Sequence, residues 1–269
     1  VFLCLKGDRF DGNQFAVQAI EQGARIVIVD SDALKSDSRF VYVENSLTAL
    51  QELAKHHFAQ MPCKKIIVGG SNGKTTTKEV SRTVLSAAGI TLATPGNWNN
   101  HIGVPLTLLS VTPAHEYAII ELGTNHPGEM KVLCDLISPD AGIITNIGKE
   151  HLEGFGDIET VAKEESEVYL RLMSNHGLAI VNIDDDWLNS MKKRLNNQLT
   201  ISTLNKQADF FAQIHEEMPL LTFDLYHQQV LVGSFSSSLS GRYNAYNLLF
   251  GTALGVSYGL NAAESMSLA

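Results

Sequence analysis

The chain has 269 residues, and its 44% hydrophobic content is enough to bury a large core and to exclude a disordered protein. Its net charge of −9 argues against a surface for duplex nucleic acid, which would show a basic stripe. We see no apolar run that could span a membrane, no signal peptide, and no C-x-x-C spacing among the three cysteines. We therefore expect a cytoplasmic protein with reduced, buried thiols, no membrane insertion and no nucleic-acid partner.

The first 62 residues are predicted to form a small α/β unit. Gly23 is a typical residue to end its first helix, and Pro62 ends its second. The chain begins at Val1 inside an apolar run, so we expect this unit to be partial and the chain to be a fragment. The predicted elements are strands over 1–5, 25–29 and 40–43, and helices over 14–22 and 46–60.

From residue 63 onwards, apolar strands alternate with amphipathic helices, which is typical of a parallel sheet covered on both faces. Residues 220–235, "LLTFDLYHQQVLVGSF", alternate in polarity and predict an antiparallel hairpin at the sheet edge. A last helix is predicted over 243–258. The fold class is therefore α/β, with a mostly parallel sheet flanked by helices, and the central strands are predicted at 66–69, 117–121, 141–146 and 178–182.

A glycine-rich loop, "VGGSNGKTTTKEV" at 68–80, joins the first of these strands to a helix. Several backbone N–H groups and a helix N-terminus then surround one point, which favours a bound phosphate. Lys74 would bridge the β- and γ-phosphates of a nucleotide, and the Thr75 hydroxyl would bind Mg²⁺. The loop is a variant P-loop, because Val68 stands where the usual pattern has its first glycine. A simple glycine-rich connection between strand and helix is the alternative.

Glu121 ends the strand predicted at 117–121, where a carboxylate would meet Mg²⁺ at the carboxyl edge of a parallel sheet. A regulatory GTPase is disfavoured. The nearest match to its guanine-reading motif, Asn205 to Asp209, places the aspartate one residue late, and no Asp-x-x-Gly motif appears.

Together, five stretches resemble the Mur ligases, the ATP-dependent ligases of peptidoglycan synthesis. Within that family the similarity is greatest to members that join D-alanyl-D-alanine to UDP-N-acetylmuramoyl-tripeptide, and "LKGDRFDG" at 5–12 resembles their uridine-nucleotide domain. The stretches are "GGSNGKTT" at 69–76, "TPGNWNNHIGVPLTLL" at 94–109, "IIELGTNHPGEM" at 119–130, "ITNIGKEHLEGFG" at 144–156 and "SGRYNAYN" at 240–247.

The resemblance implies a partial uridine-nucleotide-binding domain over 1–62 and a central ATP-binding P-loop domain over 63–269. It implies ATP and Mg²⁺ as cofactors, and UDP-N-acetylmuramoyl-tripeptide and D-alanyl-D-alanine as substrates. A carboxylate would attack the γ-phosphate to give an acyl phosphate, which an amine would then displace. As a fragment, the chain would bind nucleotide without turnover. Another Mur-type or folylpolyglutamate-type ligase, or a non-catalytic nucleotide-binding module, remains possible.

The resemblance also assigns roles to single residues. Thr75 and Glu121 would hold one Mg²⁺ and His151 a second, although imidazole is a soft ligand and a histidine at a helix start is the alternative. The phosphates would be held by Gly70, Ser71, Asn72, Gly73, Lys74, Thr75 and Thr76. Contacts to the muramoyl peptide are expected from Asn97, Asn99, Asn100 and His126, with turn formation as the alternative.

Asn244 and Asn247 share one helix face and could present their amides to the adenine edge, unless Asn244 only caps the helix. Family members usually have histidine at the position of Tyr243. Many also carry a carboxylated lysine that helps to bind the second Mg²⁺, and in "VAKEESEVY" at 161–169 that position is Glu165. We hypothesise that Glu165 supplies the carboxylate instead, because Lys163 lies on another helix face; a solvent-exposed glutamate is the alternative. Lys74, Asn100, His151 and Glu165 are thus the expected catalytic residues.

Overall fold

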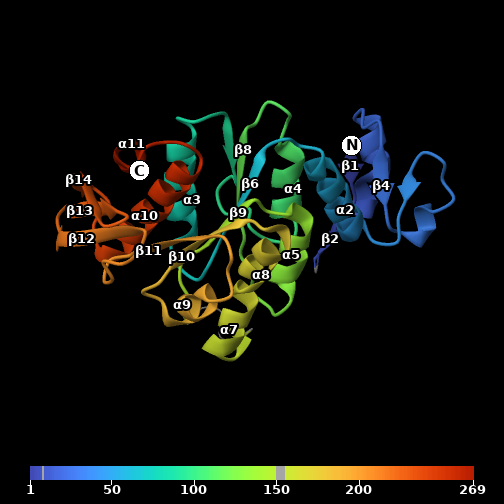
Figure 1. Ribbon diagram of the computed structural model, residues 1–269. Helices are drawn as coiled ribbons and strands as arrows, with labels where there is room; N and C mark the ends of the chain where they lie inside the picture. The colour runs from blue at the N-terminus through green and yellow to red at the C-terminus, as the bar shows by residue number, and fades with distance from the viewer. Residues whose placement is uncertain (8, 150–154) are drawn as a thin grey trace.

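The computed structural model describes residues 1–7, 9–149 and 155–269, and it places a small N-terminal unit beside a larger central unit (Figure 1). The N-terminal unit has a three-stranded parallel sheet of order β1-β4-β5 and a two-stranded antiparallel ladder, β2-β3. Its elements are β1 (Phe2–Leu3), β2 (Lys6–Gly7), β3 (Phe10–Asp11), the 3-10 helix η1 (Gly12–Phe15), α1 (Ala16–Glu21), β4 (Val27–Val29), the 3-10 helix η2 (Asp32–Leu34) and β5 (Val41–Tyr42).

The N-terminal elements are shorter than predicted. The strand expected over 1–5 stops after β1, because the Leu5 N–H bonds the Leu3 carbonyl at 3.0 Å and turns the chain. The helix expected over 14–22 begins as a 3-10 turn, because the Asp11 carboxylate accepts the Asn13 N–H at 2.9 Å. Regular α-helix then covers only α1.

Helix α2 (Ser46–Ala59) connects the two units and confirms the helix predicted over 46–60. Its Asn45 N-cap accepts the Thr48 N–H at 2.9 Å. Ala54 and Phe58 are buried in the core of the central unit, where α2 packs against α4 and α5. Residues before position 62 thus pack with the central unit, and the domain boundary at residue 62 stays a prediction.

A nine-stranded sheet of order β14-β13-β12-β11-β10-β9-β6-β8-β7 forms the central unit. Neighbouring strands from β7 to β12 run parallel, whereas β12, β13 and β14 pair antiparallel, so the predicted hairpin at the sheet edge is confirmed. The strands are β6 (Lys64–Gly69), β7 (Thr91–Ala93), β8 (Tyr117–Glu121), β9 (Ala141–Ile144), β10 (Leu178–Asn182), β11 (Gln198–Ser202), β12 (Phe210–Glu216), β13 (Leu221–His227) and β14 (Val230–Ser237).

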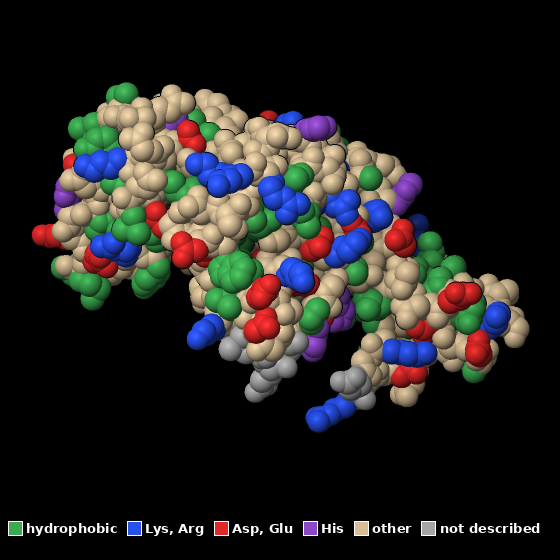
Figure 2. Space-filling view, turned by 60° about the horizontal axis from the view of Figure 1, so that its bottom comes forward, with side chains coloured by type: hydrophobic (Ala, Val, Ile, Leu, Met, Phe, Trp, Pro, Cys, Tyr) green, Lys and Arg blue, Asp and Glu red, His purple; other side chains and the backbone are tan. Residues whose placement is uncertain are grey.

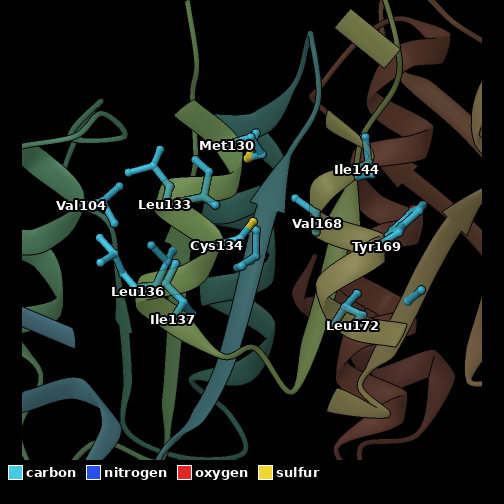
Figure 3. Close-up of a cluster of buried hydrophobic side chains, with 14 of the residues drawn as sticks. Val104, Met130, Leu133, Cys134, Leu136, Ile137, Ile144, Val168, Tyr169 and Leu172 are labelled. Carbon is cyan, nitrogen blue, oxygen red and sulfur yellow. The ribbon is translucent and has the colours of Figure 1, made fainter. Parts of the chain in front are cut away.

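Helices cover both faces of this sheet, as expected for buried parallel strands. In β6, Ile66 and Val68 point into one core cluster, whereas Ile67 points into the opposite one. Side chains of α4, α5, β9 and α8 contribute to the cluster that contains Ile67, on the second face of the sheet (Figure 3). The first face carries α3 (Lys74–Leu85), α10 (Arg242–Ser257) and α11 (Ala262–Leu268); the second carries α2, α4 (Gly103–Ser110), α5 (Glu129–Ile137), α7 (Ile158–Glu165), α8 (Glu167–Asn175) and α9 (Asp186–Lys192).

The displayed surface carries charges of both signs, and the thiols agree with the expectation from the sequence. In the space-filling view the N-terminal unit appears as a smaller lobe, and basic and acidic side chains are interspersed on the displayed face (Figure 2). Cys4, Cys63 and Cys134 are free and buried, as predicted. Among the residues that the structure describes, no helix combines the length and apolar character needed to cross a bilayer.

The carboxyl ends of β6, β8, β9 and β10 lie at one edge of the sheet, because these strands are parallel neighbours. In open α/β sheets this edge is where ligands bind. The glycine-rich loop, Glu121 and the segments that follow β9 and β10 all start there.

Candidate active site

The glycine-rich loop turns sharply between β6 and α3. Gly70 and Gly73 have backbone φ values of +108° and +83°, which residues with a side chain rarely adopt. A Cβ atom at Gly70 would overlap Thr145, and one at Gly73 would lie 2.8 Å from the Asn247 Oδ1 atom. Both glycines are therefore required by the backbone conformation and by the neighbours that it approaches.

Protein groups already hold the first half of this loop. The Ser71 N–H donates to the Asn146 carbonyl at 2.8 Å, and the Asn72 N–H donates to the Asn146 side chain at 3.2 Å. The Gly70 N–H donates to Glu165 at 2.6 Å. The first N–H groups of a helix have no partner within the helix, so the first turn of α3 is the part of the loop best suited to bind an anion. The resemblance implies phosphate contacts along the whole of residues 70–76, and those contacts stay predictions.

Lys74 lies over the same loop. Its ammonium group donates to the Gly70 carbonyl at 2.5 Å and to the Ser71 carbonyl at 3.0 Å. A positive charge is thereby fixed next to the helix N-terminus, which adds to the attraction for an anion.

Glu121 is the centre of a buried polar cluster at the end of β8. The side chain is 1% exposed. Its Oε1 atom accepts hydrogen bonds from Thr75 Oγ1 at 3.2 Å and from Asn99 Nδ2 at 2.9 Å. Its Oε2 atom accepts no hydrogen bond from the described residues, and the Lys78 ammonium lies 3.5 Å away. A buried carboxylate oxygen without a hydrogen bond, next to a hydroxyl, suits a hard divalent cation such as Mg²⁺.

Glu165 is also buried, on the side of α7 that faces the glycine-rich loop. It is 2% exposed, and its contact with the Gly70 N–H depends on the missing side chain at Gly69, where a Cβ atom would lie 2.8 Å from Oε2. Lys163 is exposed on the same helix. The alternative of a solvent-exposed Glu165 is therefore wrong. Its role as a metal ligand stays a prediction, since His151, the expected neighbour, lies outside the described residues.

Metal binding must accordingly be judged from Thr75, Glu121 and Glu165. Across residues 1–7, 9–149 and 155–269 no group of three or more His, Cys, Asp or Glu side chains could hold an ion. A site completed by hydroxyl, phosphate or water oxygens is compatible with this, because Mg²⁺ usually takes only one or two protein carboxylates.

The three asparagines of the loop before α4 have different surroundings. Asn99 contacts Glu121, as described above. Asn100 Oδ1 accepts the N–H groups of Ile102 and Gly103 at 3.1 and 2.9 Å and so caps the start of α4. Asn97 is exposed. The side-chain oxygen of Asn100 therefore has the turn-forming role that was the alternative to substrate contact. The substrate contacts of all three asparagines stay predictions.

His126 lies on an exposed loop after β8. Its Nδ1 atom is 3.4 Å from Glu129 Oε1. The same loop is held from α7, because Glu164 accepts the N–H groups of Gly128 and Met130 at 2.8 and 2.6 Å. The predicted substrate role of His126 is untested by these contacts.

A pocket of about 630 Å³ begins at the glycine-rich loop and extends to α10. Backbone and amide groups, two carboxylates and two tyrosines contribute to its lining. Its lining residues are Asn72, Gly73, Thr76, Thr145, Asn146, Asn182, Asp184, Asp185, Tyr243, Asn244, Tyr246 and Asn247.

Asn244 and Asn247 are joined to the glycine-rich loop by a chain of hydrogen bonds. Thr77 Oγ1 donates to Asn247 at 2.9 Å, Asn247 donates to Asn244 at 2.9 Å, and Asn244 donates to the Ser240 carbonyl at 2.7 Å. Much of the hydrogen-bonding capacity of both amides is therefore used inside the protein. They line the pocket as predicted, but contact with an adenine edge stays a prediction.

Several site residues were missed in the sequence. Tyr246 donates to Asp184 at 2.8 Å, and burial raises the pKa of Tyr246 to about 12, so it remains a hydrogen-bond donor at neutral pH. Asp184 lies two residues after the end of β10, at the same edge of the sheet as Glu121, and that position was the available signal. Lys78 was detectable as a lysine one turn beyond Lys74, on the apolar side of an amphipathic helix.

Comparisons with known proteins place this geometry in a family. A model of the Mur ligase middle domain matches residues 68–255, and a model described as the Mur ligase family catalytic domain matches residues 1–58. The chain is 40% identical over 264 residues to the UDP-N-acetylmuramoyl-tripeptide--D-alanyl-D-alanine ligase of Escherichia coli strain K12, covering 96% of this chain and 57% of that protein.

Solved structures agree with this result. A crystal structure of MurF from Acinetobacter baumannii superimposes with a TM-score of 0.88 at 31% identity, covering 99% of this chain and 58% of that one. MurF ligase from Thermotoga maritima in complex with ADP gives a TM-score of 0.86 at 28% identity, covering 97% and 60%. The chain thus spans less than two thirds of the length of these relatives. It belongs to the Mur ligase family.

Proposed function

We propose that this chain forms the nucleotide-binding part of an ATP-dependent ligase that joins D-alanyl-D-alanine to UDP-N-acetylmuramoyl-tripeptide in peptidoglycan synthesis. The observation that carries the proposal is the meeting of Thr75 and Glu121, 3.2 Å apart, beside the first turn of α3. Relatives with this activity in their names and the ADP complex of the Thermotoga maritima protein support it. We place the reaction in the cytoplasm.

In this proposal the pocket fixes the direction of ATP. The phosphates lie at the end formed by Gly73 and Thr76, where helix N–H groups and the Lys74 ammonium neutralise them. The base and ribose lie toward Tyr243 and Asp184, because carboxylates at that end repel a triphosphate.

Mg²⁺ would be held by Thr75 and Glu121, with Glu165 as the proposed replacement for a carboxylated lysine at a second site. When bound, the metal neutralises charge on the transferred phosphoryl group. The chain itself does the positioning: Lys74 and the α3 N-terminus orient the γ-phosphate, and the Asn99 loop lies across Glu121, where the acceptor carboxylate must approach.

The chemical steps follow from these positions. An oxygen of the peptide carboxylate attacks the γ-phosphorus and ADP leaves, which gives an acyl phosphate. The neutral amino nitrogen of D-alanyl-D-alanine then attacks the acyl carbon, the bond from that carbon to the phosphate oxygen breaks, and the proton lost by the amine leaves with hydrogen phosphate, which completes the amide. The first step moves negative charge onto the departing ADP, beside the proposed position of the Lys74 ammonium, and a fixed donor is most effective where charge develops.

The test is phosphate release by the protein that carries this chain, expressed at its full natural length. We expect release only when ATP, Mg²⁺, UDP-N-acetylmuramoyl-tripeptide and D-alanyl-D-alanine are all present. UDP-N-acetylmuramoyl-dipeptide or a folate with glutamate in place of the tripeptide should give none. Equal release with either of these would favour another ligase of the same fold, and nucleotide binding without release would favour a non-catalytic module.

A further inference from the structure

Lys78 is a lysine buried to 0% exposure inside the site, one helical turn after Lys74. A buried ammonium group is costly unless protein atoms use its donors and balance its charge. The proposed function gives this residue no role, so its contacts require an explanation.

Its contacts reach two different segments of the site. The ammonium donates to the carbonyls of Thr94 and Gly96 at 2.8 and 3.0 Å. It also lies 3.5 Å from Glu121 Oε2 and 3.1 Å from Glu79 Oε1. Residues 94–96 are the stem of the loop that carries Asn97, Asn99 and Asn100, which we name the asparagine loop (residues 94–100).

The asparagine loop and Glu121 are also bonded directly to each other. The Glu121 N–H donates to Thr94 Oγ1 at 2.9 Å, and Asn99 Nδ2 donates to Glu121 Oε1 at 2.9 Å. The Gly123 N–H donates to the Asn99 carbonyl at 2.8 Å. Lys78 therefore closes a ring of contacts that joins α3, the asparagine loop and the end of β8.

We infer that Lys78 is a positioning residue that fixes the asparagine loop and the Glu121 carboxylate relative to the first turn of α3. The inference rests on the proposed function for its catalytic meaning. The first turn of α3 holds the phosphoryl donor, and the asparagine loop lies where the acceptor carboxylate approaches. Lys78 thus sets the distance between donor and acceptor without touching either.

Amide hydrogen exchange tests the structural half of this inference without any substrate. In Lys78→Met the apolar stem is kept and the ammonium is lost, so we expect amides in residues 94–103 to exchange about tenfold faster, as loss of hydrogen bonds to a charged donor implies. Amides of β10 and β11, which Lys78 does not contact, should exchange as in the parent protein.

The matched control is Arg82→Met, because Arg82 is a cation on the same helix that also pairs with Glu79, at 2.8 Å, but is exposed. It should leave both segments unchanged. Unchanged exchange at 94–103 in a folded Lys78→Met protein, or an equal rise in β10 and β11, would overturn the inference. If Lys78→Met does not fold, Lys78→Gln is measured instead, with a smaller rise at 94–103 expected and the same two contrary outcomes.

Steady-state kinetics at full natural length test the catalytic half. In Lys78→Met the KM for UDP-N-acetylmuramoyl-tripeptide should rise about tenfold, while the Kd for ATP measured without Mg²⁺ stays within about threefold, because the contacts of Lys78 are to the asparagine loop and to Glu121 rather than to the pocket. A parallel loss of both affinities would contradict a positioning role. A parent protein without ligase activity would instead refute the proposed function, and the exchange experiment would still decide the role of Lys78.

Discussion

The glycine-rich loop has two sides that differ in burial and charge. On the Glu121 side, Lys78 and Glu121 are 0% and 1% exposed and face each other as opposite charges. On the α10 side, amides, two tyrosines and two carboxylates line the pocket, and Tyr243 is 70% exposed. Charges act strongly only where water is excluded, so under the proposed function the first side would carry the phosphoryl chemistry and the second would hold the nucleoside.

This difference predicts that substitutions on the Glu121 side cost far more than those on the α10 side. On the first side, a lost partner leaves a buried charge unpaired. On the second, the side chains of Asn244 and Asn247 are neutral, so a lost hydrogen bond leaves no unpaired charge. The predictions below test this gradient.

The largest effect is expected from Glu121→Gln. The carboxylate that pairs with buried Lys78 is removed, so the free energy of unfolding should fall by about 3–5 kcal/mol. The ligase rate should fall at least about a hundredfold, because one charged group of the phosphoryl site is gone. Urea unfolding and phosphate release measure the two quantities.

Glu79→Gln is the matched control, because Glu79 lies 3.1 Å from the same ammonium but is half exposed. We expect a loss of no more than about 1 kcal/mol from it. If Glu121→Gln and Glu79→Gln destabilise the protein equally, the burial of the Glu121 cluster has no energetic consequence and the comparison fails.

Lys74→Met should separate activity from stability. The ammonium donates to the Gly70 and Ser71 carbonyls of the glycine-rich loop, and replacing a hydrogen-bonded charge on a half-buried side chain should lower the free energy of unfolding by about 1–3 kcal/mol, less than for Glu121→Gln. The rate of phosphate release should fall about a hundredfold or more, as for other donors to a developing anion. A loss of stability as large as that of Glu121→Gln would show that the lysine is mainly structural.

The fold was largely predictable from the sequence, because long apolar strands and glycine stops leave clear patterns. The strands at 117–121 and 178–182 agree with the structure residue for residue. Strands β7, β11 and β12 were not predicted. β7 has only three residues. β11 comes just before the change from parallel to antiparallel pairing, and β12 is the strand at which that change occurs.

The site was predictable where a motif fixes the backbone and less so where partners come from distant segments. Gly70, Gly73 and Thr75 follow from the loop pattern. The contacts of Glu165 with Gly70 and of Lys78 with Thr94 join residues far apart in the chain, and only the tertiary fold determines them. For the same reason the sequence could not show that Asn244 and Asn247 bond to each other.

A moderate effect is expected from Asn247→Ala on the α10 side. It removes the acceptor of Thr77 and the donor to Asn244, so the Kd for ATP should rise about tenfold, equal to about 1.4 kcal/mol. Titration calorimetry with ATP and Mg²⁺ measures it. Thr77→Val removes only the hydrogen bond from Thr77 to Asn247 and should raise the Kd for ATP less. A larger rise than for Asn247→Ala would contradict the idea that Asn247 is the central link between Thr77 and Asn244.

The smallest effect is expected from Tyr246→Phe, and it has a pH signature. Burial raises the pKa of Tyr246 to about 12, above its value of about 10 in the unfolded chain. The folded state therefore holds this proton more tightly, and the resulting stability is present below pH 10 and is lost as the pH rises toward 12. The fall in Tm above pH 10 should be shallower in Tyr246→Phe than in the parent protein, while the Kd for ATP changes only about two- to fourfold at pH 7.5.

Tyr169 and Tyr258, whose pKa values burial also raises, contribute equally to both proteins, so the difference between the two curves isolates Tyr246. Identical curves would mean that the hydroxyl is hydrated rather than held by Asp184.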